Sequence, residues 1–153
     1  MSTRCRIGIE NKDGTITSIY CHHDGYISGG VGEMLAIHYT DEAKVRKLME
    51  LGDISSLGTE PVSNPNAWKT PGEGAIFSGN WNEIWHELHP KNMCDAYESR
   101  GEDCPAETHK DIKEYKEYSY DCGGEFTYLY KDGKWQVLTE GFTDLVKALD
   151  EGE

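Results

Sequence analysis

The sequence predicts a single α+β domain over residues 1–153, in which helices cover mainly one face of an antiparallel sheet of four or five strands. Three observations predict this fold. Two segments with the alternating polarity of strands each turn back at a Lys-Asp-Gly, at residues 12–14 and 131–133. Between them the apolar spacing lengthens to three or four residues, as in amphipathic helices. The length of 153 residues suits one domain.

The first predicted hairpin joins residues 4–10, RCRIGIE, to residues 15–21, TITSIYC. The first segment alternates, which is typical of a strand buried on one face. Its apolar positions are Cys5, Ile7 and Ile9. Gly14 supplies the positive φ that the turn needs. We expect Cys5 and Cys21 to be buried thiols that act as small apolar residues.

Two short helices follow, over residues 31–39 and 41–51. The second has an apolar stripe of Val45, Leu48 and Met49. Thr40 is the expected N-cap of this helix, and Gly52 is the expected stop. Residues 53–58, DISSLG, are then predicted to form a structured turn.

Two long loops or insertions are predicted within the domain, at residues 59–74 and 90–110. The first holds three of the five prolines, and the second is polar and irregular. Between them we expect a short strand at 75–77 and a helix at 80–89.

The last third of the chain is predicted to return to β structure. Residues 112–120, IKEYKEYSY, are rich in tyrosine, which favours a strand. A second hairpin follows over residues 125–139. Residues 139–153 are predicted to form an amphipathic helix with these apolar residues: Phe142, Leu145, Val146 and Leu149.

The charge of the chain is strongly negative and uneven. Fifteen basic and 28 acidic residues give −13, and residues 51–153, with nine basic and 21 acidic residues, carry −12 of it. This charge repels phosphates and argues against direct nucleic-acid binding, whereas it attracts a basic protein surface. No apolar run approaches the ~20 residues of a membrane span, so we expect no membrane association and a cytoplasmic protein.

The five cysteines are an odd number without a secretory pattern, and we expect them to be reduced. One combination of ligands suits a structural zinc: His86, His89, Cys94 and Cys104. Nine residues separate the two cysteines, and the chain has no Cys-x-x-Cys motif. We therefore expect no cofactor, with zinc at these four residues as the alternative.

Residues 19–35, IYCHHDGYISGGVGEML, hold the candidate ligand site. Here a predicted strand leads through glycines into a helix whose N-terminal amides we expect to be unpaired, and such an end can hold a phosphate or carboxylate. The other interpretation is that the glycines only serve the turn. The expected ligand-binding residues are His22, Asp24, Tyr26, Ser28, Gly30 and Arg100.

Catalysis has weaker support. His22 and His23 are adjacent, so on an extended strand they point to opposite faces. One of them with Asp24 or Tyr26 is a possible acid–base pair. The sequence contains no Gly-x-Ser-x-Gly, Walker or His-Glu-x-x-His motif. We name no catalytic residue and expect binding in place of catalysis.

Four segments resemble a family of small uncharacterised bacteriophage and prophage proteins: TSIYCHHDGY, HYTDEAKVRKLMELGDISSLG, AYESRGED and YLYKDGKW. The family pattern has an Ile-Tyr-Cys-His-x-Asp-Gly-Tyr strand end and a Gly-Asp-Ile-Ser-Ser-Leu-Gly turn. This chain differs from it at His23, where an aromatic is common, and at Ile27, where proline is common. It also has the single Arg100 where two arginines usually flank an aspartate.

The resemblance implies a counter-defence protein of the host bacterial cytoplasm. The first hypothesis is a non-enzymatic inhibitor, anti-CRISPR or similar, that binds a basic host defence protein through its acidic surface. The alternative is an oligomeric sponge that sequesters a nucleotide immune signal in a pocket of His22, Asp24, Tyr26 and Arg100. A third hypothesis is a signal-degrading or metal-dependent hydrolase.

Overall fold

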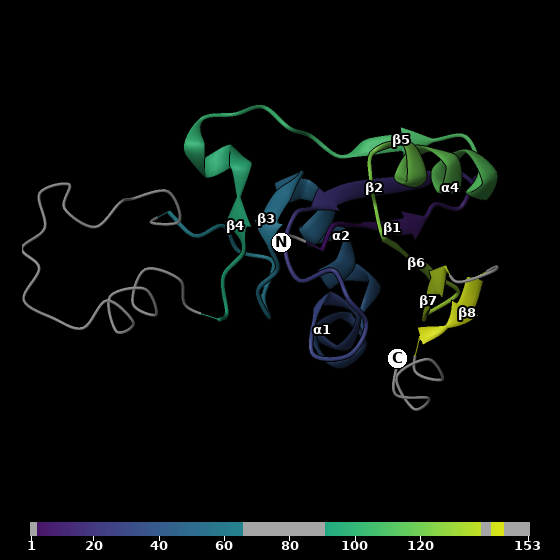
Figure 1. The fold of residues 1–153 in the computed structure, drawn as a ribbon, viewed down its shortest axis with the longest axis horizontal. Coiled ribbons are helices and arrows are strands. Elements are labelled where there is room, and N and C mark those ends of the chain that lie inside the picture. Colours follow the sequence, from purple (N-terminus) through teal and green to yellow (C-terminus); the bar gives the residue numbers. More distant parts are fainter. Residues whose placement is uncertain (1–2, 66–90, 139–141, 146–153) are drawn as a thin grey trace, which may run out of the picture.

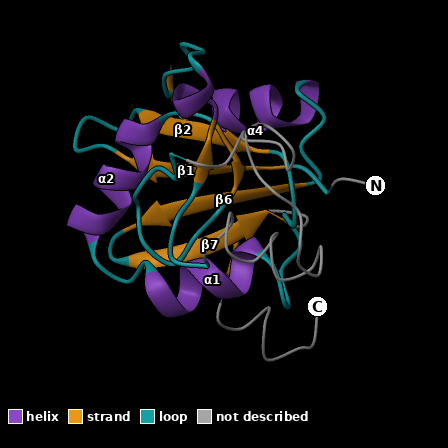
Figure 2. Ribbon diagram, turned by 90° about the vertical axis from the view of Figure 1, so that its left-hand side faces the viewer, coloured by secondary structure: helices purple, strands orange, loops and turns teal. Residues whose placement is uncertain are grey.

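The computed structural model describes residues 3–65, 91–138 and 142–145. In this part of the chain an eight-stranded sheet lies between helices on both faces (Figures 1 and 2). The strand order is β4-β3-β2-β1-β6-β7-β8, and β5 pairs with β2. The α+β class is therefore confirmed. The expected antiparallel sheet of four or five strands is corrected to a mixed sheet, because β1 pairs with β6 and β2 with β3 in parallel.

The first hairpin forms as predicted, from β1 (Cys5–Glu10) and β2 (Ile16–Cys21). The two strands are antiparallel, with Cys5 opposite Cys21, and both cysteines are fully buried. Gly14 has a φ of 89° in the turn. This hairpin lies at the centre of the sheet. Its side chains on each face therefore form much of the surface against which the helices pack.

Helices α1 (Val31–His38) and α2 (Glu42–Leu51) also form as predicted, and both pack on the face that carries Cys5, Ile7 and Ile9. The N-cap of α2 is Asp41 and not Thr40, because the Asp41 carboxylate accepts a hydrogen bond of 3.3 Å from the Ala43 amide. Gly52, with a φ of 74°, ends the helix.

The segments expected to be turns and loops contain several short elements. The predicted turn at 53–58 holds β3 (Ile54–Ser56). The predicted loop at 90–110 holds β4 (Asp95–Ala96), the 3₁₀ helix η1 (Tyr97–Arg100) and β5 (Glu107–His109). Residues 59–65 contribute only an isolated bridge of Ser63 to Cys94. The strand and helix predicted at 75–77 and 80–89 lie outside the described residues.

The strand predicted at 112–120 is wrong, because residues Ile112–Asp121 form helix α4. Asp111 is its N-cap and accepts a hydrogen bond of 2.9 Å from the Glu114 amide. The buried positions Tyr115 and Ser119 are four residues apart, which is a helical spacing. Tyr115 packs on Ile16 and Leu129 on the face opposite α1 and α2. Helices therefore cover both faces, whereas we expected them mainly on one.

The second hairpin is confirmed, with β6 (Phe126–Lys131) and β7 (Lys134–Leu138). Asp132 and Gly133 have φ values of 52° and 77°, as an Asp-Gly two-residue turn requires. β8 (Phe142–Asp144) pairs with β7, so residues 142–144 of the predicted C-terminal helix form a strand, and residues 139–141 lie outside the described part. Leu145 is buried as its apolar pattern predicted, and residues 146–153 lie outside the described part.

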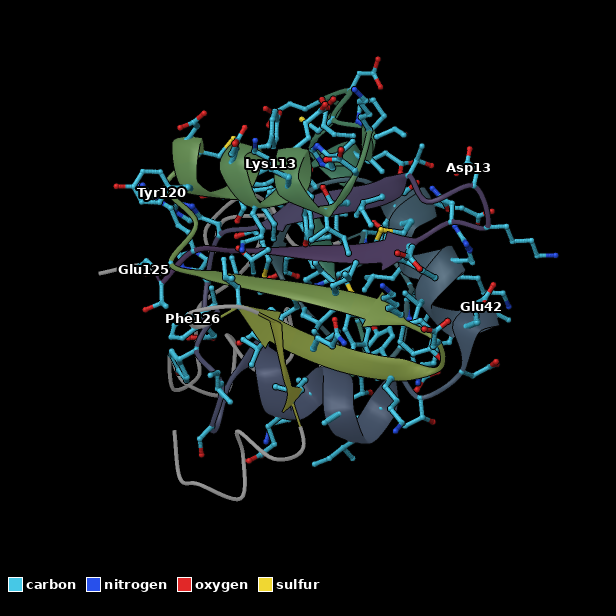
Figure 3. The ribbon with its side chains drawn as sticks, turned by 90° about the vertical axis from the view of Figure 1, so that its right-hand side faces the viewer. Asp13, Glu42, Lys113, Tyr120, Glu125 and Phe126 are labelled. Carbon is cyan, nitrogen blue, oxygen red and sulfur yellow. The ribbon has the colours of Figure 1, made fainter. Side chains whose placement is uncertain are left out.

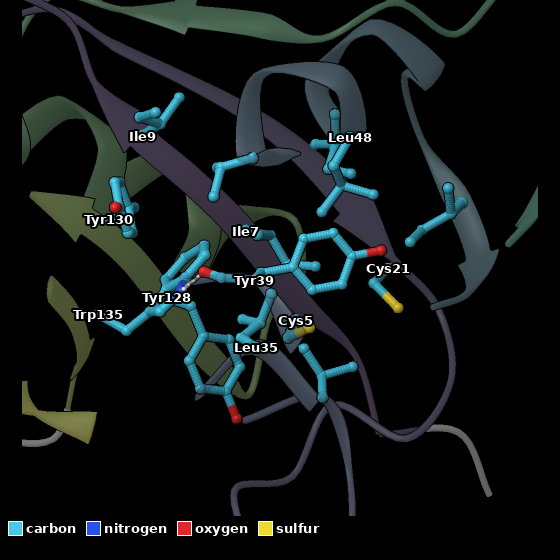
Figure 4. Close-up of a cluster of buried hydrophobic side chains, with 14 of the residues drawn as sticks. Cys5, Ile7, Ile9, Cys21, Leu35, Tyr39, Leu48, Tyr128, Tyr130 and Trp135 are labelled. Carbon is cyan, nitrogen blue, oxygen red and sulfur yellow. Dashed lines mark hydrogen bonds between the residues drawn. The ribbon is translucent and has the colours of Figure 1, made fainter. Parts of the chain in front are cut away.

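The main core lies between the sheet and helices α1 and α2 (Figure 4), and its tryptophan and tyrosine side chains donate hydrogen bonds to backbone carbonyls at its edge. Trp135 Nε1 donates to the Tyr39 carbonyl at 2.7 Å, and Tyr128 Oη donates to the Gly25 carbonyl at 2.7 Å. These bonds satisfy buried polar groups that would otherwise destabilise the core. The second of them holds the loop between β2 and α1, where the candidate ligand site lies.

Candidate functional site

The predicted ligand site lies in the loop that joins β2 to α1. Asp24 has a left-handed backbone with a φ of 59°. A Cβ on Gly30 would lie 2.5 Å from the Asp24 carbonyl oxygen, and one on Gly32 would lie 2.8 Å from Ile27 Cα. The glycines at positions 30 and 32 are therefore required by the close approach of the loop to the helix.

The amides at the start of α1 are occupied by this same loop. Val31 N donates to the Asp24 carbonyl at 2.7 Å, and Glu33 N donates to the Ile27 carbonyl at 2.8 Å. Gly32 N donates to the carbonyl of Tyr26 at 3.2 Å. The expectation that these amides are unpaired is therefore wrong. The amides of the first turn of α1 are therefore not available to a ligand.

The structure brings some of the predicted ligand residues together. Tyr26 Oη donates to Asp24 Oδ1 at 3.2 Å, and the Tyr26 side chain is 39% exposed. Ser28 is exposed in the same loop. His22 is directed to Tyr20, with 2.7 Å between Nδ1 and the Tyr20 hydroxyl. Arg100 belongs to η1, after β4. The ligand-binding role of the six residues stays a prediction.

A second polar site lies on the face of the sheet that α4 covers only in part. We name it the arginine–tyrosine patch and define it as Arg4, Arg6, Tyr20, His22 and Tyr118. Arg6 lies opposite Tyr20 in the register of β1 and β2, and the Tyr118 ring of α4 lies over the Arg6 guanidinium at 4.7 Å. Arg4 is exposed, Arg6 is 3% exposed, and the other three are half-buried.

Below the patch, a buried hydrogen-bond network joins Arg6 to His109 through Ser18. Arg6 Nε donates to Ser18 Oγ at 3.0 Å, and Nη2 reaches the Ser18 carbonyl at 3.3 Å. Ser18 Oγ and His109 Nε2 are 2.7 Å apart. If Ser18 Oγ accepts from Arg6 Nε, its own hydroxyl hydrogen can donate to His109 Nε2, and the ring proton of His109 then sits on Nδ1.

The surroundings keep both histidines of this face neutral near pH 7. Burial lowers the pKa of His109 most, and the positive charge of Arg6 lowers it further, while Glu114 and Glu107 act in the opposite direction. Burial, His23 and Arg4, in that order, lower the pKa of His22. Ser18 and His109 are a hydroxyl and a base at hydrogen-bond distance, but both are buried and closed to a substrate.

A series of exposed carboxylates lies along a different side of the molecule from the patch. Residues 97–121, from η1 through β5 to α4, run along the upper side in Figure 1. Exposed carboxylates recur along this segment: Glu98, Glu102, Asp103, Glu107, Asp111, Glu114, Glu117 and Asp121. On α4 the residues Glu114, Glu117 and Asp121 are spaced by three and four, so they form one line that we name the acidic stripe.

The neighbouring face of α4 differs in charge. Lys113 and Tyr120 project from the helix at the surface (Figure 3), and Tyr120 is 82% exposed. A cavity of about 450 Å³ adjoins this face, lined by Lys116, Glu117, Tyr120, Asp121 and Leu138. The helix therefore presents a line of carboxylates beside a line of lysine and tyrosine side chains.

The zinc alternative is not tested by the part of the chain that the structure describes. His86 and His89 lie outside it, Cys94 is buried with its Sγ 3.2 Å from the Gly58 amide, and Cys104 is half-buried. Burial raises the pKa of Cys94 to about 11, mainly by desolvation of the thiolate. Among the described residues no group of three or more histidine, cysteine or acidic side chains could hold a metal.

No family model, curated protein or solved structure matches this chain. Across the described ranges, no helix has the length and apolar content to cross a membrane. The arguments for function therefore rest on the residues themselves.

Sequence reasoning missed Arg6, Ser18 and His109 as members of one site. Part of the signal was present, because the alternation in RCRIGIE places Arg4 and Arg6 on the face opposite the apolar residues. Ser18 lies in the predicted second strand, whereas His109 comes from β5 and Tyr118 from α4, and neither of these two elements was predicted. The alternation predicted the face of the sheet on which Arg6 lies, but it predicted neither the burial of Arg6 nor its surroundings.

Proposed function

We propose that the protein is a non-enzymatic inhibitor that binds a basic surface of a host defence protein, and that it serves a bacteriophage or prophage in the bacterial cytoplasm. The observation that carries the proposal is the line of exposed carboxylates along η1, β5 and α4, with the acidic stripe as its most regular part. The role in counter-defence rests on the resemblance to phage proteins described above.

The acidic stripe suits a protein partner for a physical reason. Glu114, Glu117 and Asp121 stand on one face of a helix that the sheet supports from below, so their backbone positions are fixed before binding. A backbone that is already ordered costs no further conformational entropy on association. Complementary charges also accelerate encounter and select basic partners, and their effect weakens as salt screens them.

The nucleotide sponge is kept as a second candidate, because one observation favours it. Two of the four arginines of this acidic chain, Arg4 and Arg6, lie two residues apart on one face of the sheet beside Tyr20. Arginine with an aromatic ring is a common arrangement for phosphate and base recognition. The homo-oligomer expected of a sponge stays a prediction.

The proposal is tested by plasmid interference in bacteria. Strains that each carry one defined CRISPR–Cas or restriction system receive a targeted plasmid while they express the protein. We expect relief of interference in at least one strain, lost in the variant E114Q/E117Q/D121N. The matched control is E33Q/E50Q/D132N, which changes the net charge equally at exposed residues outside this segment.

The variant E114Q/E117Q/D121N loses three exposed ion pairs with the partner. At about 0.5 kcal/mol for each pair, affinity for the partner should fall about tenfold. Relief that survives in the acidic-stripe variant, or that is lost equally in the control variant, contradicts binding through the stripe. Absence of relief in every strain contradicts inhibition of these systems.

A further inference from the structure

We propose that the arginine–tyrosine patch is a binding site for a nucleotide, that is, a ligand that carries a phosphate group and an aromatic base. The patch shares only His22 with the ligand site predicted in the loop before α1. The inference is independent of the acidic stripe, which lies on the exposed face of α4, away from β1 and β2.

The charge of Arg6 is the first argument. The side chain is 3% exposed, and its polar contacts are Ser18 and the Tyr118 ring. Among the residues that the structure describes, it forms no ion pair with a carboxylate. Burial raises the pKa of the Asp53 carboxyl, and the positive charge of Arg6 lowers it without forming an ion pair with Asp53. A buried charge without a counter-ion is unfavourable, and a bound anion would offset this.

Arg4 adds a second positive charge at the surface. It precedes Arg6 by two residues on the same face, which places the two Cα atoms about 7 Å apart. Arg4 lies one residue before the pairing of Cys5 with Cys21, and its charge lowers the pKa of His22 after burial and the charge of His23. In the described part of the chain the Arg4 guanidinium also forms no ion pair. At the surface Arg4 can bind a phosphate group directly, and the charge of the buried Arg6 attracts the same group from below.

The remaining members of the patch supply hydrogen-bond donors and aromatic rings. When the Tyr20 hydroxyl donates to His22 Nδ1, the neutral ring keeps its hydrogen on Nε2, where it can donate to a phosphate oxygen. The half-buried Tyr20 ring lies beside the arginines and offers a surface on which a base can stack. Such stacking contributes about 1–3 kcal/mol for each base.

The experiment is an NMR titration of ¹⁵N-labelled protein with adenosine 5′-monophosphate (AMP), adenosine and inorganic phosphate at constant ionic strength. We expect saturable shifts in residues 4–6 and 18–23, and an affinity for AMP at least tenfold above that for adenosine or phosphate. Arg4→Gln should weaken AMP binding at least tenfold. Lys12→Gln, which removes an exposed charge at the hairpin turn, should change it less than twofold.

A second variant separates the base from the phosphate. Tyr20→Leu should lower the affinity for AMP and leave that for phosphate unchanged within twofold. Unperturbed amide signals of α2 and β7 in each variant show that the fold is intact. AMP that causes no saturable shifts, or equal losses in the Arg4 and Lys12 variants, overturns the site. Equal affinities for AMP and phosphate overturn the assignment of a nucleotide.

Failure of the nucleotide site in the titration can be distinguished from failure of the proposed function. The plasmid-interference assay reports on the acidic stripe, whereas the titration uses purified protein without any partner. A patch that binds AMP in the variant E114Q/E117Q/D121N as it does in the unaltered chain shows that the two sites are separate.

Discussion

Gly8→Ala tests the packing of α4, the helix that the sequence did not predict. A Cβ at Gly8 would lie 2.8 Å from Tyr115 Cζ and Oη, and 3.1 Å from Ile16 Cγ2. Tyr115 is fully buried and donates to the Tyr128 carbonyl at 2.6 Å, so its ring has no space to withdraw. The substitution should therefore push α4 away from the sheet and strain this hydrogen bond.

The expected loss of stability is about 2 kcal/mol. Overpacking of a close-packed site costs about 1–3 kcal/mol. Weakening of the buried Tyr115 hydrogen bond adds about 1 kcal/mol. Alanine restricts the unfolded chain more than glycine does, which offsets about 0.4–1 kcal/mol.

The assay is urea unfolding followed by circular dichroism, with the midpoint and slope compared between variants. A double-mutant cycle with Tyr115→Leu supplies the control, because leucine is too short to meet the new methyl group. In that background Gly8→Ala should cost less than about 0.5 kcal/mol, which gives a coupling energy of at least about 1.5 kcal/mol. A loss below 0.5 kcal/mol in both backgrounds would refute the packing of Tyr115 on Gly8.

Three further predictions concern α4, the buried network and the thiols. Asp111→Ala removes the N-cap of α4 and should destabilise the protein by about 1 kcal/mol in urea unfolding, whereas Asp111→Asn should be nearly neutral. Because burial holds the folded-state pKa of His109 below its unfolded value of about 6.5, His109 should reduce stability as the pH falls below that value. The loss between pH 7.5 and 5.5 should be smaller in His109→Gln, and an equal loss contradicts the network. In a thiol-reagent assay at pH 7, the exposed Cys122 should react fast, and three buried thiols should react only after unfolding: Cys5, Cys21 and Cys94.

Local signals in the sequence were sufficient for the hairpins and the first two helices. Both Lys-Asp-Gly turns provide a glycine with positive φ between alternating segments, and the stripe of α2 is regular. The error at α4 arose because its tyrosines favour strands, whereas Asp111 and Glu114 supply the hydrogen bonds that start a helix. At this segment the capping residues therefore indicated the correct structure, a helix, whereas the β propensity of the tyrosines did not.

Long-range pairing could not be predicted from local patterns. The parallel contact of β1 with β6 joins segments more than 100 residues apart, and an alternating strand carries no mark of its neighbour's direction. Prediction of the candidate sites from local patterns was limited in the same way. The loop before α1 was found from its composition, whereas the arginine–tyrosine patch depends on Tyr118 of α4, which lies over Arg6 only in the folded chain.

The most direct test of the account is the affinity of the purified protein for the defence protein that it inhibits, measured by calorimetry between 50 mM and 500 mM sodium chloride. If the acidic stripe makes the contact, affinity should fall steeply with salt. The variant E114Q/E117Q/D121N should then bind about tenfold more weakly at low salt and show a shallower salt dependence. A complex that is indifferent to salt, and equally strong in that variant, would contradict binding through the stripe.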